Sequence, residues 1–164
     1  MNGRCVTMDF ERKGKVVLAE GTFDLLHYGH VYYLTNAKKL GGEKSKLIVI
    51  VARDKTVERL KGRKPIIPED QRRAIVEALK VVDEAILGYE EMDIVKVIEK
   101  VKPDIIALGY DKEDMERNLK RYVGEKNLNV EVVRLNRFEG GDISSSSKIK
   151  RKIIEEYRSN IQQI

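Results

Sequence analysis

Five short apolar runs constrain the fold of this chain more than any other feature. The segments between these runs show helical periodicity. An apolar run of this length, bounded by glycine or polar residues, is typical of a strand that is buried on both faces, as in parallel sheets covered by helices. The sequence therefore predicts one doubly wound α/β domain, with a mostly parallel five-stranded sheet and helices on both faces. The five runs are 15–20, 47–52, 85–88, 105–109 and 130–135.

The segment from residue 15 to residue 52 shows the pattern most clearly. Between its two apolar runs, Val31, Leu34, Ala37 and Leu40 recur at helical spacing, and two glycines follow where the helix would end. A strand, a helix and a strand in so short a stretch predict parallel strands that are joined by a right-handed crossover.

Two further helices set the expected limits of the domain. Pro68 and the acids after it are typical of a helix start, and the apolar stripe of this helix would run over residues 75–82. A last helix would begin in a run of serines and continue to about Arg158. The expected parts are an N-terminal extension over 1–14, the domain over 15–158 and a C-terminal tail over 159–164.

Composition narrows the partners that such a domain can have. The net charge of +5 favours anionic ligands. The single cysteine, Cys5, excludes an internal disulfide, no apolar run approaches the roughly 18 residues of a membrane span, and no signal-peptide pattern opens the chain. We expect a cytoplasmic protein that binds no membrane and no nucleic acid, since aromatic residues are few and nucleic-acid recognition motifs are missing from the sequence.

The candidate chemistry concentrates at the end of the first predicted strand. Residues 20–30 read Glu-Gly-Thr-Phe-Asp-Leu-Leu-His-Tyr-Gly-His, and they contain both histidines of the protein, His27 and His30. A helix start has unpaired N–H groups, and Gly29 would let a ligand approach the backbone. This arrangement favours a bound phosphate, to which two imidazoles could donate hydrogen bonds during a reaction.

Three other segments also follow predicted strands. They are Arg53-Asp54, Tyr110-Asp111 and residues 137–146. In an open parallel sheet, ligands bind beyond the carboxyl ends of the strands, near the point where the strand order reverses. We therefore expect these segments to meet residues 22–30 in one crevice.

Two motifs in these segments resemble a known family. Residues 21–30 resemble the HxGH signature of the cytidylyltransferase-like nucleotidyltransferases. Residues 137–145 are similar to the second signature of that family, an RTEGIST-type loop before the last helix, but carry a two-residue insertion and Phe138 in place of threonine. The resemblance covers residues 15–155. The amino-acid sequence at 62–68 and 108–111 is most similar to that of the archaeal FAD synthases.

The resemblance implies that FMN is joined to the AMP moiety of ATP, giving FAD and pyrophosphate. His27 and His30 would be the catalytic donors, and Asp24 and Lys64 would lie on the side of the acceptor or leaving phosphate. Mg²⁺ would travel with the triphosphate, without ligands from protein side chains. The serines would hold the β- and γ-phosphates, and Asp111 and Phe138 would meet the ribose and base. The implied nucleotide-binding residues are Thr22, Phe23, His27, Tyr28, Gly29, His30, Asp111, Arg137, Phe138, Ser144, Ser145 and Ser146.

Structural roles remain open for several of these positions. The serine run can be a simple helix cap, Asp111 can cap the next helix, and residues 61–64 can be a solvated basic turn. Residues 148–152 would form a charged helix face. Tyr32 and Tyr33 face different ways on a helix, so at least one of them would only pack.

Two alternative functions also remain open. A CTP-dependent transferase that acts on glycerol 3-phosphate or another small alcohol phosphate would share the fold and both histidines. A nucleotide-binding regulatory module without catalysis belongs to a different class, and the intact histidine pair disfavours it. A homodimer is expected from the resemblance.

Overall fold

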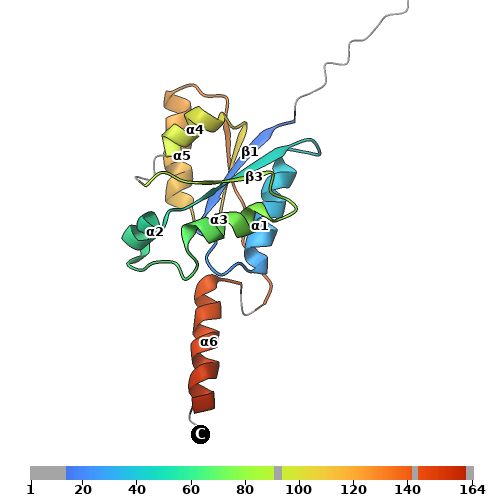
Figure 1. Ribbon diagram of the computed structural model, residues 1–164. Coiled ribbons are helices and arrows are strands. Elements are labelled where there is room, and N and C mark those ends of the chain that lie inside the picture. Colours follow the sequence, from blue (N-terminus) through green and yellow to red (C-terminus); the bar gives the residue numbers. More distant parts are fainter. Residues whose placement is uncertain (1–13, 91–93, 142–143, 162–164) are drawn as a thin grey trace, which may run out of the picture.

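Five parallel strands form one sheet in the computed structural model, which describes residues 14–90, 94–141 and 144–161 (Figure 1). The spatial order is β3-β2-β1-β4-β5, and every pairing is parallel. The predicted doubly wound α/β class is therefore confirmed, with a sheet that is parallel throughout. The strands are β1 (Val16–Gly21), β2 (Lys46–Val51), β3 (Glu84–Leu87), β4 (Ile105–Leu108) and β5 (Glu131–Arg134).

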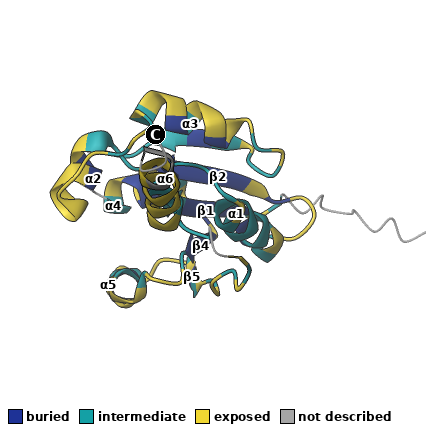
Figure 2. Ribbon diagram, turned by 90° about the horizontal axis from the view of Figure 1, so that it is seen from below, coloured by how far each residue is buried: buried dark blue, intermediate teal, exposed yellow. Residues whose placement is uncertain are grey.

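Helices cover both faces of the sheet (Figure 2). Leu34 of α1 and Val76 of α3 belong to the core cluster on one face, whereas Val97 of α4 and Leu119 of α5 belong to the cluster on the other. This division explains why the strands are apolar without alternation. The helices are α1 (Tyr28–Leu40), α2 (Asp54–Lys61), α3 (Glu69–Glu77), α4 (Ile94–Val101), α5 (Glu113–Glu125) and α6 (Ser146–Ile161).

The strand order places a switch point beside β1. The chain adds β2 and β3 on one side of β1, and then β4 and β5 on the other side. Loops that leave β1 and β4 therefore diverge, and a crevice is expected beyond the carboxyl ends of these two strands.

Helix α3 is shorter than the sequence predicts. It ends at Glu77, and the next residues turn, with the N–H of Leu79 donating to the carbonyl of Val76 and the N–H of Val82 donating to the carbonyl of Leu79. Leu79 and Val82 still pack against the core. The apolar pattern over 75–82 is therefore wrong on the helix and only half right on packing: Leu79 and Val82 are partly buried, but Ile75 is 38% exposed.

Helix α6 projects away from the rest of the domain (Figure 1). It continues to Ile161, past the predicted end at Arg158, and its residues 151–158 are exposed. None of the helices in the described ranges is both long and apolar enough to cross a membrane. The expected extension over 1–14 lies outside these ranges apart from Gly14, so the proposed domain limits stay predictions.

Candidate active site

A cavity of about 500 Å³ opens at the switch point. Its walls come from the β1–α1 loop, the turn after β4, the segment after β5 and the start of α6, which meet in one crevice as predicted. This volume is ordinary for a small-molecule site. All predicted site residues except Tyr28 line the cavity, namely Thr22, Phe23, Asp24, His27, Gly29, His30, Lys64, Asp111, Arg137, Phe138, Ser144, Ser145 and Ser146.

Three residues that were expected in the crevice lie outside this cavity. Tyr28 is 63% exposed, and the edge of its ring meets the ring of Phe138 with 4.9 Å between centroids. Arg53 and Asp54 do not line the cavity, because both side chains form ion pairs with residues of α3. The expectation that Arg53 and Asp54 would line the crevice is therefore wrong.

The two histidines stack on each other at the start of α1. Their ring centroids lie 3.8 Å apart, and the backbone N–H of His27 donates to Nδ1 of His30 at 3.4 Å. Since that bond requires an unprotonated Nδ1, the neutral ring of His30 carries its proton on Nε2. Burial, followed by the charges of His27 and Lys61, lowers the pKa of His30 to about 3, and burial lowers the pKa of His27. Both rings are therefore neutral near pH 7, and each can donate one N–H.

Close packing explains the glycine between these histidines. A Cβ on Gly29 would lie 2.9 Å from the ring of His27, closer than real Cβ contacts, and 3.1 Å from the carbonyl oxygen of Ser144, which is also tight. The loop before α1 is also tightly folded, because the buried Phe23 adopts a left-handed φ of 54°. The centroid of its ring lies 5.2 Å from that of His30, so this loop packs against the histidine pair.

Asp24 joins three segments beside the cavity. Its carboxylate accepts the N–H groups of Ile66 at 2.9 Å and Ile67 at 3.1 Å and the ammonium of Lys150 at 2.6 Å. Its carbonyl accepts the hydroxyl of Ser146. Burial alone would raise the pKa of Asp24, but Lys150 and the two N–H groups outweigh burial and lower it. Both carboxylate oxygens have partners within the protein, which suits a residue that positions its neighbours.

The predicted charged face over 148–152 is wrong at one position. The side chain of Lys150 is 19% exposed and pairs with Asp24, whereas that of Lys152 is 61% exposed and pairs within its own helix. The first turns of α6 contact the domain through Ser146, Ser147 and Lys150. The spacing of four residues from Ser146 to Lys150 is a signal that could have identified their shared contact, because residues so spaced share a helix face.

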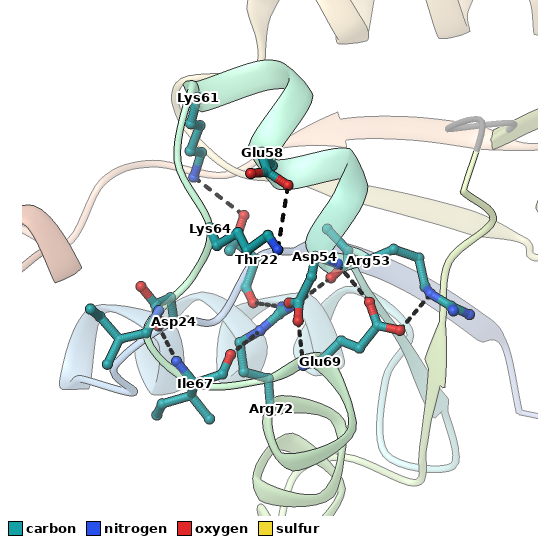
Figure 3. A network of polar contacts seen from close by, with 12 residues as sticks. Thr22, Asp24, Arg53, Asp54, Glu58, Lys61, Lys64, Ile67, Glu69 and Arg72 are labelled. Atoms are coloured by element: carbon teal, nitrogen blue, oxygen red, sulfur yellow. Dashed lines mark hydrogen bonds and ion pairs between the residues drawn. The ribbon is translucent and has the colours of Figure 1, made fainter.

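A fully buried arginine, Arg72 of α3, ties the surrounding loops together (Figure 3). Its guanidinium donates to the carbonyls of Thr22, Ala52 at 2.7 Å and Ile67 at 2.9 Å, and to the carboxylate of Asp54 at 2.6 Å. These partners follow β1 and β2 and begin or precede α2 and α3. Sequence reasoning missed this residue, because the helical pattern does not separate a buried arginine from an exposed neighbour.

The start of α6 forms another wall of the cavity. The hydroxyl of Ser145 accepts the N–H of Lys148 at 3.3 Å, so the helix-cap interpretation holds for this serine. Ser144 precedes it and also lines the cavity. Because helix starts attract anions, this wall suits the phosphates of a nucleotide.

Aromatic and cationic side chains form the wall after β4 and β5. The rings of Phe138 and Tyr32 lie 5.2 Å apart, and the guanidinium of Arg137 lies over the ring of Tyr110, 5.2 Å from its centroid. Tyr33 instead donates its hydroxyl to a carbonyl of β4 at 2.8 Å and packs, partly buried, against the core, as expected for one tyrosine of the pair. This wall offers flat surfaces on which a base can stack.

Lysines border the cavity beside β1. Lys61 Nζ lies 3.2 Å from Thr22 Oγ1, and Lys112 Nζ lies 3.2 Å from Glu20 Oε1. Burial, followed by the charge of Lys112, lowers the pKa of Lys61. Lys64, which the resemblance favoured, is 69% exposed and pairs with a glutamate of α2 at 3.9 Å. The basic turn thus lines the cavity with Lys61, Arg63 and Lys64, and no sequence signal had singled out Lys112.

Comparison with known proteins identifies the family. Residues 18–152 match the family described as Cytidylyltransferase-like, which is most of the chain. The chain belongs to this family. The resemblance drawn from the two motifs is therefore confirmed, as is the expected class of enzyme, a nucleotidyltransferase.

Relatives in the family carry a more specific name. The FAD synthase of Methanothermus fervidus is 51% identical over 136 residues, which cover 83% of this chain and 92% of that protein. The FAD synthase of Ferroglobus placidus is 53% identical over 140 residues, which cover 85% and 88%. The chain therefore spans nearly the full length of these relatives.

Solved structures show the same architecture. The lipopolysaccharide core biosynthesis protein from Thermoplasma volcanium matches with a TM-score of 0.69 at 44% identity, over 77% of this chain and 99% of that chain. Pantoate-beta-alanine ligase from Francisella tularensis matches with a TM-score of 0.59 at 14% identity, over 82% and 63%. The second likeness concerns the fold alone.

Proposed function

We propose that this protein is an FAD synthase, which transfers the AMP moiety of ATP to the phosphate of FMN and releases pyrophosphate. The observation that carries the proposal is the cavity in which the stacked, neutral histidines of α1 and the serine-lined start of α6 meet. The name and identity of the relatives support the choice of nucleotide and acceptor.

Catalysis of this reaction depends on positioning the two substrates and neutralising phosphate charge more than on proton transfer. An oxygen of the FMN phosphate attacks the α-phosphorus of ATP, and the bond from that phosphorus to the oxygen bridging to the β-phosphate breaks. Pyrophosphate leaves with the electron pair of the broken bond. A phosphate monoester is already ionised near neutral pH, so the attack needs no strong general base.

His27 and His30 would stabilise the charge that develops on the transferring phosphoryl group. Low pKa values keep both rings neutral, so they act as hydrogen-bond donors and not as charged groups. The ring of His30 is held in one tautomer by the backbone of His27, which leaves Nε2–H as its donor. Positive charge would come from the lysines beside β1.

The remaining cavity residues would hold the two substrates. Backbone N–H groups of Thr22 and Phe23 would meet the α-phosphate, with Tyr28 and Gly29 at the same helix start. Ser144, Ser145, Ser146 and Arg137 would bind the β- and γ-phosphates, and Asp111 and Phe138 the ribose and base. Asp24 and Lys64 would serve the acceptor or leaving phosphate, Asp24 through the segments that it positions.

Mg²⁺ fits this site as an ion carried by ATP. Within the described parts of the chain, no group of three or more His, Cys, Asp or Glu side chains could hold a metal, and the carboxylate of Asp24 is already bonded within the protein. Phosphate oxygens and water would then supply the ligands, and the bound ion would neutralise phosphate charge. We also propose that the enzyme is cytoplasmic and forms a homodimer. Light scattering, which gives the molar mass in solution, would test the dimer.

Product formation tests the proposal. The purified protein is incubated with Mg²⁺ and each combination of ATP or CTP with FMN or glycerol 3-phosphate, and products are separated by chromatography. FAD from ATP and FMN is the expected result. CDP-glycerol would instead establish the CTP-dependent alternative, and nucleotide binding without any product would favour the non-catalytic module.

A further inference from the structure

A second cavity adjoins the one that holds the histidines. It is a narrow slot of about 90 Å³, lined by residues of β1, β2, α2, α4 and α5 and of the turn after β3. The same side chains border both cavities, and they form a wall between the slot and the larger cavity. These wall residues are Glu20, Thr22, Val57, Lys61 and Lys112.

The slot differs from the larger cavity in chemistry. Its lining includes the buried side chains of Ile50 and Val97, and the half-buried side chain of Met115. It also includes Leu60 of α2 and Tyr89 after β3, which are 60% and 42% exposed. A concave site lined by apolar and aromatic side chains with a few polar groups is typical of a small-molecule pocket.

The wall itself carries the charges. Lys61 lies beside the hydroxyl of Thr22, and Lys112 lies beside the carboxylate of Glu20, each at 3.2 Å. Thr22 also begins the loop that leads to His27. A phosphate on the cavity side of this wall would therefore lie among ammonium groups, while an apolar body attached to that phosphate could reach the slot.

We propose that the slot, with Leu60 and Tyr89, binds the flat ring of the acceptor, the isoalloxazine of FMN, and so selects a flavin over a small alcohol phosphate. The inference rests on the proposed function and adds the residues that recognise the acceptor. The slot is smaller than a three-membered ring system, so the ring lies partly in it and partly against the two exposed side chains. Glycerol 3-phosphate has no apolar body and would leave the slot empty.

Flavin binding tests the proposal without any need for turnover. Riboflavin has the ring without the phosphate, FMN has both, and glycerol 3-phosphate has only the phosphate. Titrations follow the change in flavin fluorescence on binding. We expect Leu60→Ser and Tyr89→Ala to raise the Kd of FMN and of riboflavin about tenfold, and Tyr89→Phe to keep the affinity of the unchanged protein.

Two variants serve as matched controls. Leu128→Ser and Tyr157→Ala remove exposed side chains of the same kinds that do not line the slot, and they should leave flavin binding unchanged. In steady-state assays the slot variants should raise KM for FMN, with KM for ATP and kcat unchanged. Melting curves by circular dichroism check that every variant is folded.

The outcomes separate this inference from the proposed function. Unchanged flavin affinity in both slot variants would overturn the inference, and so would an equal loss of ATP affinity. If the unchanged protein forms no FAD from ATP and FMN, the proposed function fails. In that case the riboflavin titration still tests whether the slot binds the flavin ring, because riboflavin carries the ring without the phosphate.

Discussion

Replacing Arg72 with methionine should destabilise the fold more than any other single change beside the cavity. The side chain is fully buried, and its removal would leave three carbonyls, those of Thr22, Ala52 and Ile67, without their donor. Each unsatisfied buried group costs about 1–3 kcal/mol. Removing the guanidinium from the carboxylate of Asp54 costs less, because this carboxylate is partly exposed and still accepts the backbone N–H of Glu69 at the start of α3.

We therefore expect Arg72→Met to lower the free energy of unfolding by about 3–5 kcal/mol, the range found when one partner of a buried ion pair is removed. For a domain of this size, such a loss corresponds to a fall in Tm of about 6–20 °C. Urea titration measures the free energy, and an unchanged m-value would show that the change lies in stability.

The neighbouring arginine provides the control. Arg73 lies on the same helix, but its side chain is partly exposed. It pairs with Glu77 one turn along and donates to one carbonyl, that of Ala85 at 3.3 Å, so Arg73→Met should cost much less than Arg72→Met. Arg72→Lys should recover only part of the loss, since an ammonium cannot reproduce the fork of a guanidinium. A loss below about 1 kcal/mol for Arg72→Met, or an equal loss for Arg73→Met, would refute the reasoning.

Three further predictions concern the site. His27→Ala and His30→Ala should each lower kcat about 100- to 1000-fold in the FAD assay without unfolding the domain, and unchanged rates in both would remove the role of the pair. Stability of the unchanged protein should fall as pH is lowered from 6.5 toward 3, because the unfolded state takes up a proton that folded His30 resists. In urea titrations His30→Gln should show a shallower fall over that window, and an equal slope would contradict the low pKa. Lys150→Met leaves the buried carboxylate of Asp24 unpaired and should destabilise the domain by up to about 3 kcal/mol in thermal melts, whereas the exposed Lys152→Met should not. Similar melting of both lysine variants would contradict the assigned contact.

Local sequence patterns predicted the sheet and the main loop of the site. Continuous apolar runs imply strands that are buried on both faces, and parallel pairing then follows from the helices between them. The histidine pair was also predicted, since a strand, a turn and a helix start are all local features. The apolar stripe over 75–82 failed as a helix, because the chain turns after Glu77, and only Leu79 and Val82 of that stripe pack against the core.

The sequence by itself determined the class of fold, the histidine loop after the first strand and the preference of that loop for a phosphate. These depend on short-range periodicity and on the types of residue at strand ends. Only the tertiary structure decided which charged side chains are buried. Arg72 and Lys150 look like their exposed neighbours in the sequence, and they differ because their partners come from loops far away in the chain. The slot beside the cavity has the same origin, since strands, helices and a turn that are remote in sequence each supply one part of its lining.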